Sequence, residues 1–414
     1  MSEPLYDADL LVVGGGAAGF FAALRAADLA PEKRIVLLEG SGKTLNKVRI
    51  SGGGRCNLTH ACFDPAELVK FYPRGSKELL GPFHKFGPGD TLDWFEARQV
   101  EAKTEEDGRM FPITDSSETV AHCLEQEAEN LGIQIRLSQR VTAIHRREEG
   151  FTLQMASGPS LTAPLVMVAS GSQPAMWDIM ARLGHEIVPP VPSLFTFKIL
   201  APGLSELSGI SVPQARVSLP SQDIHTEGPL LITHEGLSGP AVLRLSAWAA
   251  RAFADLNYRS KIEVNWTGLE EAKMEWQIQK VRAQDSKKNP GSTPLAGLPS
   301  RLWLWILGRA GVSANQRWAD LTATQMEAIQ RECLHCQLSM TGKSTFKEEF
   351  VTAGGVELSE LDFRRFESRK VPGLFLAGEV INIDAITGGF NFQAAWTGGW
   401  LAGTEIGQRM GGGG

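Results

Sequence analysis

The hydrophobic and polar positions at the start of the chain predict a strand, a turn, a helix and a second strand. Residues 10–13 form a short apolar run, an Ala-rich stretch with helical character follows a group of glycines, and residues 35–38 are apolar again. Continuous apolar runs of this length are typical of parallel strands buried on both faces. The pattern therefore predicts a βαβ unit in this part of the chain.

Later segments continue the alternation of strands and helices. An amphipathic helix is predicted over residues 119–131, because Gly132 then provides a helix stop. Strands are predicted over residues 133–137, 141–144, 165–169 and 374–377, and a last helix over about 390–410. These elements indicate an α/β fold.

The middle of the chain has a different character. A proline cluster at residues 189–192 precedes short strand-like runs and then a Trp- and Gln-containing stretch that we expect to be helical from Leu269 to Leu338. A Gly-rich sequence typical of a strand follows at residues 351–355. We therefore expect a discontinuous Rossmann-like domain over residues 1–193 and 348–410. An inserted substrate or cap domain is expected over 194–347, β-rich over 194–265 and helical over 266–347.

The glycines after the first strand, in Gly14-Gly15-Gly16-Ala17-Ala18-Gly19, predict a dinucleotide-binding turn. Gly14 allows the turn, Gly16 lets the backbone approach a pyrophosphate at the helix N-terminus, and Gly19 lets helix and strand pack closely. Glu39 ends the second strand about 20 residues later, where an acid accepts the ribose hydroxyls of an adenosine.

Composition limits the function classes. The chain has 414 residues and a net charge of −6, and its basic residues are scattered, which argues against a nucleic-acid partner. No uninterrupted apolar stretch is long enough to span a membrane, so we expect no membrane partner. Five cysteines in a chain of this length favour reduced thiols in a cytoplasmic protein. Gly411-Gly412-Gly413-Gly414 is expected to be a disordered tail.

Two further Gly-rich blocks carry candidate chemistry. Ser51-Gly52-Gly53-Gly54-Arg55 is a turn whose backbone N–H groups suit a closely wrapped cofactor, and Arg55 can pair with a phosphate. In the second block, Gly378 and Glu379 end a buried strand, and Gly388-Gly389 leads into a helix that opens near Asn391. A surface loop and a plain connection into a core helix are the structural alternatives.

These motifs together resemble the bacterial flavoproteins of the aminoacetone oxidase and bile-acid dehydratase-like group, which are NAD(P)/FAD-dependent oxidoreductases with two dinucleotide-binding regions. The remaining matching segments are Cys56-Asn57, Glu106-Asp107-Gly108-Arg109-Met110-Phe111-Pro112, Thr233-His234-Glu235-Gly236-Leu237-Ser238-Gly239-Pro240, Thr352-Ala353-Gly354-Gly355-Val356 and Pro372-Gly373-Leu374. The resemblance covers both ends of the chain and its middle, and the helical part of the insert matches loosely.

The resemblance implies FAD as cofactor, with NAD(P)H as a co-substrate. The cofactor-binding residues that it and the motifs imply are Gly14, Gly16, Ala17, Ala18, Gly19, Glu39, Gly53, Gly54, Arg55, Cys56, Asn57, Val141, Ser170, Gly171, Gly378, Glu379, Asp384, Gly388, Gly389 and Asn391. Asp384 suits the ribityl hydroxyls, and Val141 matches the family's adenine-side strand. After Gly171 the chain departs from the family pattern, which leaves this segment's approach to the flavin open.

The spacing of the cysteines tests whether the chain could be a flavin disulfide reductase or a metal-binding protein. Cys56 and Cys62 are separated by five residues, whereas flavin disulfide reductases use two cysteines separated by four, so that class is disfavoured. A small core residue is the alternative for Cys56. Cys333 and Cys336 form a single CxxC late in a helical pattern, so we expect two helical neighbours and no metal site.

His234 and Arg109 are the candidate catalytic residues. Histidine titrates near neutrality and Arg109 suits a substrate or flavin contact, although both residues also suit structural roles beside Gly-rich turns. We expect Arg55 and Asn391 to lie nearest the flavin, and the His234 turn to cover it, because an open flavin reacts with solvent and oxygen.

The sequence thus favours an FAD-dependent oxidoreductase acting on a small organic substrate through hydride transfer at flavin N5. A flavoprotein that acts on tRNA or another nucleic acid, and a flavin-binding protein without turnover, are the alternatives. The substrate, the nicotinamide, the proton donor and the oligomeric state are open.

Overall fold

The computed structural model describes residues 6–344 and 351–412, and the chain divides into two compact units. Unit 1 comprises residues 1–190 and 351–414, and unit 2 comprises residues 191–350. Gly413 and Gly414 of the expected tail, and the upper limit expected for the insert, residue 347, lie outside the described residues.

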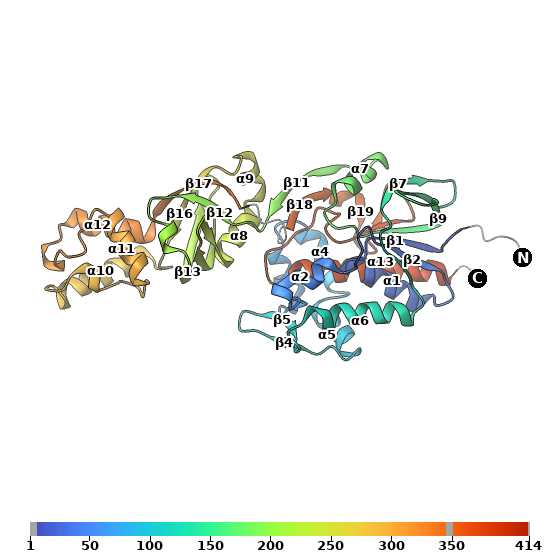
Figure 1. Ribbon diagram of the computed structural model, residues 1–414, viewed down its shortest axis with the longest axis horizontal. Coiled ribbons are helices and arrows are strands. Elements are labelled where there is room, and N and C mark those ends of the chain that lie inside the picture. The colour runs from blue at the N-terminus through green and yellow to red at the C-terminus, as the bar shows by residue number, and fades with distance from the viewer. Residues whose placement is uncertain (1–5, 345–350, 413–414) are drawn as a thin grey trace, which may run out of the picture. The chain divides into compact units, whose positions relative to one another are not determined.

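Unit 1 is built on a seven-stranded sheet with the strand order β19-β20-β21-β10-β1-β2-β6 (Figure 1). The parallel strands are β21 (Leu374–Leu376), β10 (Leu165–Val168), β1 (Leu10–Val13), β2 (Ile35–Leu38) and β6 (Gln134–Arg136). An antiparallel edge consists of β19 (Leu361–Asp362) and β20 (Glu367–Ser368). The α/β class is therefore confirmed, and β21 shares a sheet with β1 as predicted.

Helices and smaller sheets surround this sheet. The helices are α1 (Ala17–Leu29), α2 (Asn46–Gly54), α3 (Pro65–Leu68), α4 (Ser76–Phe83), α5 (Pro88–Glu96), α6 (Ser117–Asn130), α7 (Pro174–Arg182) and α13 (Phe390–Gly411). The smaller sheets are β3 (Thr59–His60) with β5 (Arg109–Pro112) and β4 (Ala102–Thr104), and β7 (Val141–Arg146) with β8 (Phe151–Met155) and β9 (Leu161–Ala163). β11 (Ile187–Ser193) pairs with β18 (Val351–Val356).

Helices α1 and α13, from opposite ends of the chain, lie side by side (Figure 1). Glycines at every fourth position of α13 make this approach close. A Cβ added at Gly399 or Gly403 would lie 2.5 Å from a carbonyl oxygen of α1, and one at Gly407 would lie 2.7 Å from the Cβ of Leu29. The two helices therefore meet backbone to backbone, which excludes larger side chains on this face of α13.

Unit 2 contains a closed barrel with helices packed against it (Figure 1). The barrel strands, in spatial order, are β12 (Phe197–Leu200), β15 (Gly236–Ser238), β14 (Ile224–Ile232), β13 (Ser211–Leu219), β16 (Ser260–Asn265) and β17 (Cys336–Lys343). The helices are α8 (Pro240–Trp248), α9 (Ala250–Asp255), α10 (Glu271–Gln284), α11 (Ser300–Arg309) and α12 (Ala323–Leu334).

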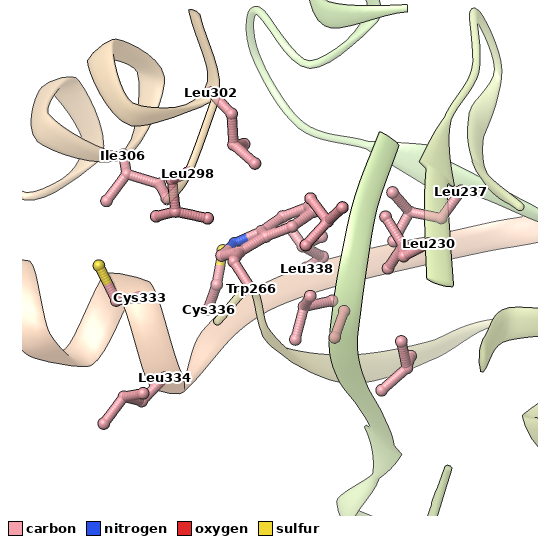
Figure 2. Packing of buried hydrophobic residues seen from close by; sticks show 14 of the residues in the cluster. Leu230, Leu237, Trp266, Leu298, Leu302, Ile306, Cys333, Leu334, Cys336 and Leu338 are labelled. Carbon is pink, nitrogen blue, oxygen red and sulfur yellow. The ribbon is translucent and has the colours of Figure 1, made fainter. Parts of the chain in front are cut away.

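A single hydrophobic core joins the barrel to α10–α12. Figure 2 shows the fully buried Trp266 at the junction, with Leu230, Leu237 and Leu338 from the barrel and Leu298, Leu302 and Ile306 from the helical segment. Because these side chains share one core, the β-rich and helical parts of the insert are one unit rather than two.

The expected helical stretch from Leu269 to Leu338 is wrong at its C-terminal end. Cys336 begins β17, which pairs with both β16 and β12 to close the barrel, so Cys333 and Cys336 are not two helical neighbours. Strand pairing with distant residues overrides the local helical pattern there. Both thiols are buried, and burial raises the pKa of Cys336 to about 12 and also raises that of Cys333, which makes them poor nucleophiles.

Candidate functional site

Predicted cofactor residues gather at the carboxyl ends of four adjacent parallel strands of unit 1. Residues 14–18 follow β1, Glu39 follows β2, Ser170 and Gly171 follow β10, and Gly378 and Glu379 follow β21. Ligands of open α/β sheets bind at such an edge. The sheet topology thus brings together groups that are far apart in the sequence.

The turn between β1 and α1 has the backbone that a dinucleotide site requires. Gly14 has φ of 110°, and a Cβ there would lie 2.3 Å from the carbonyl oxygen of Ala169. A Cβ at Gly19 would lie 2.0 Å from the carbonyl oxygen of Gly14, whereas one at Gly16 would meet nothing within 4 Å. No side chain caps the first turn of α1, which begins with Ala17 and Ala18. The turn therefore leaves room for a diphosphate beside the helix N-terminus.

Glu39 stabilises this turn through hydrogen bonds. Its carboxylate accepts hydrogen bonds from the backbone N–H groups of Gly15 and Ser41, both at 2.8 Å. The backbone of residues 138–139 bonds to Glu39 and Ser41 and leads into β7, which begins with the buried Val141. Each carboxylate oxygen has a further lone pair for a ribose hydroxyl, so the position of Glu39 fits the adenosine end of a dinucleotide.

The Gly-rich segment at the C-terminal end of α2 departs from helical geometry and forms an open turn. Ser51 leaves the helical conformation, and Gly52, Gly53 and Gly54 have φ of 58°, 70° and 86°. Cβ atoms at Gly53 and Gly54 would meet nothing within 4 Å, so a planar group can approach this backbone closely. The Cys56 thiol that follows is buried, and burial raises its pKa to about 12 despite a hydrogen bond with Ser51. Cys56 thus has the character of a core residue.

Asn57 links this segment to the N-terminus of α13. With its amide oriented to satisfy both neighbours, Asn57 accepts a hydrogen bond from the Gly389 N–H at 2.9 Å and donates one to the Thr59 carbonyl at 3.1 Å. Gly388 and Gly389 have φ of 131° and 91°. The two Gly-rich blocks singled out in the sequence therefore lie together in unit 1.

Arg55 and Arg109 converge on one carboxylate, a pairing that the sequence did not predict. Arg55 bonds to one oxygen of Glu105 at 2.6 Å and Arg109 bonds to the other at 2.9 Å. The guanidinium carbons lie 3.9 and 5.5 Å from the centroid of the Phe111 ring. Asp107 also bonds to Arg109, at 2.7 Å. An anionic ligand would have to displace these carboxylates or share the guanidinium groups with them.

Polar side chains in the C-terminal block are engaged in holding the backbone. The carboxylate of Asp384, which is fully buried, pairs with the guanidinium of Arg74. Asn391 accepts from the Ala385 N–H at 3.0 Å and donates to the Ala385 carbonyl at 3.1 Å. These contacts favour roles in shaping the turn before α13, with the glycines left to approach the ligand. Glu379 pairs with Lys47 at 2.6 Å.

A buried polar network that sequence analysis missed lies beneath this turn. Oε1 of Gln393 accepts from the hydroxyls of Thr59, at 2.6 Å, and Thr91, at 3.1 Å. Its Nε2 donates to the hydroxyl of Thr397 at 3.1 Å. All four residues have no exposed surface. The network fixes α13 to β3 and α5, and no local pattern signals it because its members are distant in sequence.

His234 lies in unit 2, on the turn between β14 and β15, and is exposed. Its neighbour Glu235 pairs with Lys198 at 3.4 Å. The expectation that this turn covers the flavin stays a prediction.

Of the described helices in either unit, none combines the length and apolar character needed to cross a membrane.

The chain is similar to known proteins over nearly its whole length. The chain is 29% identical over 410 residues to a ribosomal RNA dihydrouridine synthase of Escherichia coli, covering 96% of this chain and 98% of that protein. It is 28% identical over 412 residues to a 3-dehydro-bile acid delta(4,6)-reductase of Clostridium scindens, with the same coverage. A 3-ketosteroid-delta4-(5alpha)-dehydrogenase of Rhodococcus jostii shares the fold, with a TM-score of 0.52, 13% identity and 98% of each chain covered.

Residues 8–405 match the family described as the HI0933-like protein Rossmann domain. The match spans nearly the whole chain and confirms the resemblance to FAD-dependent oxidoreductases of Rossmann type that the motifs indicated. The chain belongs to the HI0933-like Rossmann family.

Proposed function

We propose that this chain is an FAD-dependent reductase that uses NAD(P)H to saturate a carbon–carbon double bond conjugated with a carbonyl group in a small organic molecule. The observation that carries the proposal is the edge of the unit 1 sheet. The open turn at Gly16 lies at this edge, and the Gly53-Gly54 and Gly388-Gly389 turns belong to the same compact unit. This arrangement suits an extended dinucleotide cofactor with a planar end.

The residues fit FAD in distinct ways. The uncapped first turn of α1 would bind the diphosphate, and Glu39 would accept hydrogen bonds from the adenosine ribose. The backbones of residues 53–54 and 388–389 would flank the isoalloxazine, and the N-terminus of α13 would favour negative charge on it. Bound FAD supplies hydride transfer, and the protein supplies binding, orientation and electrostatics.

We infer the reaction class from the names of two relatives. Dihydrouridine differs from uridine by saturation of a double bond conjugated with a carbonyl, and a delta(4,6)-reductase of a 3-dehydro-bile acid acts on double bonds conjugated with a ketone. Such reductions add a hydride at the β carbon and a proton at the α carbon. A cation or hydrogen-bond donor at the carbonyl oxygen assists the addition, a role that we assign to Arg109. We propose His234 as the proton donor.

Anaerobic reduction of the purified flavoprotein tests this proposal. NADH and NADPH are added separately while the visible flavin absorbance is followed, and then a cyclic enone, a 3-oxo-4,6-diene steroid or oxygen is added. We expect bleaching by one nicotinamide and reoxidation by the conjugated acceptors. Bleaching with no reoxidation by either acceptor would contradict the substrate class, and no bleaching by either nicotinamide would favour a flavin-binding protein without turnover.

An RNA base is a second candidate acceptor. The relative of 29% identity that is named as a ribosomal RNA dihydrouridine synthase favours it. Unit 2 carries 17 Lys and Arg against 15 Asp and Glu, so its formal charge is +2 and that of unit 1 is −8. The charge argument against nucleic acid therefore applies to unit 1 alone. Reoxidation of the reduced flavin by a uridine-rich RNA hairpin, with formation of dihydrouridine, would support this second candidate.

A further inference from the structure

One face of α10 in unit 2 exposes a large aromatic side chain between two lysines. Trp276 is 58% exposed, the highest exposure among the exposed large hydrophobic residues on α8–α12. Lys280 Nζ lies 4.8 Å from the centroid of the indole ring, and Lys273 lies one turn earlier and is exposed. An exposed indole of this size has no part in the core of the unit.

The opposite face of α10 explains why the helix is stable without covering Trp276. Met274 and Ile278 are buried in the core of unit 2, Val281 packs against it, and α10 contacts α12. The side chain of Gln277 accepts a hydrogen bond from the Ala296 N–H at 3.0 Å. The face that carries Trp276 is therefore available on a helix that is already anchored.

The charge on this face has one sign. With about 100° of rotation per residue, Ala272, Lys273, Gln279, Lys280 and Ala283 lie within about 60° of Trp276 around the helix. The carboxylates of Glu275 and Glu271 lie about 100° and 140° away. In the part of the chain that the structure describes, no ion pair joins Lys273 or Lys280 to a carboxylate. Lys287 follows the end of α10 and is also exposed.

We propose that this face, formed by Lys273, Trp276 and Lys280, binds unpaired nucleotides of an RNA. An indole with a free face stacks on a base, and flanking ammonium groups neutralise the phosphates on either side. The small side chains of Ala272 and Ala283 allow a flat ligand to approach along the helix. An acidic protein segment would use the lysines and leave the indole without a stacking partner, so RNA accounts for both features. The proposal rests on the second candidate function, in which an RNA base is the acceptor.

The test uses the full-length flavoprotein and a fluorescein-labelled RNA hairpin with a uridine-rich loop, with affinity followed by fluorescence polarisation. Trp276→Ala is expected to weaken binding by roughly five- to hundred-fold, the range for loss of one stacked base. Trp248→Ala, at the 42% exposed tryptophan of α8, is the matched control and should leave affinity unchanged. Flavin content and the rate of reduction by NAD(P)H should be the same in all variants.

Salt dependence distinguishes the lysines from the indole. Replacing both Lys273 and Lys280 with glutamine should make the plot of log affinity against log salt less steep. The magnitude of its negative slope should decrease by about 1.4, since each phosphate contact in a single strand contributes about 0.7. Trp276→Ala should leave that slope unchanged. Wild-type affinity in Trp276→Ala would overturn the proposal, as would equal binding of polyglutamate or of anionic phosphatidylserine vesicles.

The outcomes separate this surface from the function on which it rests. Dihydrouridine formation that is unaffected by Trp276→Ala, at RNA concentrations below saturation, would reject the surface and support the acceptor. Trp276-dependent hairpin binding without any reduction of uridine would support the surface and reject RNA as the acceptor.

Discussion

Replacing Gly16 with valine is expected to abolish FAD binding while leaving unit 1 folded. The backbone at Gly16 is extended, with φ of −98° and ψ of −171°, and a Cβ there meets nothing within 4 Å. Valine adopts this conformation, so the apoprotein should lose only about 1 kcal/mol from the poorer helix N-cap. The branched side chain would fill the space beside the first turn of α1 that we assign to the diphosphate.

Gly19→Ala provides the contrasting variant. Its Cβ would lie 2.0 Å from the carbonyl oxygen of Gly14, so the turn or the helix must move. Overpacking of this kind costs about 2–3 kcal/mol. In a unit of this size that corresponds to a decrease of roughly 4–12 °C in Tm. Gly19→Ala should therefore be unstable even without flavin, whereas Gly16→Val should be stable and flavin-free.

The assay measures two quantities on each variant. Flavin per protein is determined by absorbance after heat release, and Tm is determined by circular dichroism on flavin-free protein, so that ligand stabilisation does not mask the backbone effect. Wild-type flavin content in Gly16→Val would refute the assignment of the diphosphate to this turn. An unchanged Tm in Gly19→Ala would refute the argument from close packing.

Four further outcomes are expected. Arg74→Leu should lower the free energy of unfolding by about 3–5 kcal/mol, because the buried Asp384 carboxylate loses the positive charge of the Arg74 guanidinium; a loss below about 1 kcal/mol in urea titration would contradict this. Gln393→Leu should cost about 1–3 kcal/mol by the same measurement, because the buried Thr59 hydroxyl loses the acceptor to which it donates at 2.6 Å. His234→Ala should slow reoxidation of the reduced flavin by the acceptor in stopped flow at unchanged flavin content, whereas a loss of flavin or Tm alone would indicate a structural role. Burial would raise the pKa of Glu367, but hydrogen bonds from Arg409 and the Gly373 N–H lower it below its ordinary value of 4.5. The ionised Glu367 carboxylate therefore stabilises the fold at neutral pH, and this stabilisation is lost as the group is protonated on acidification. The Tm difference between wild type and Glu367→Gln should shrink below pH 4.5, and a difference that grows there would contradict the argument.

The strands and helices that carry a clear local hydrophobic pattern were predicted from the sequence. Strands β1, β2, β10 and β21 are continuous apolar runs, and α13 extends over Phe390–Gly411, close to the range expected from Phe390 to Met410. The strand β17 was missed because Cys336–Lys343 becomes a strand by pairing with β12 and β16, which lie far away in the sequence.

The same distinction applies to the site. The Gly-rich turns were found because glycine spacing is a local signal. The partners of Arg55, Asp384 and Asn391 were not found, because Glu105, Arg74 and the Ala385 backbone reach them only in the folded chain. Net charge describes the chain as a whole and does not show that the acidic excess belongs to unit 1, whereas the exposed lysines of α10 belong to unit 2.

The contact between α1 and α13 has a consequence for how the protein is made. The residues of α1 leave the ribosome early, and the glycine face of α13 that packs against them is translated after every other helix of unit 1. Unit 2 is encoded by one contiguous segment between the two halves of unit 1, so it has all of its partners before α13 exists. Unit 2 can therefore fold during synthesis, whereas unit 1 must wait with an exposed apolar sheet. A nascent chain stalled before Phe390 should consequently resist proteases over residues 191–344 and be cleaved within the described residues of unit 1.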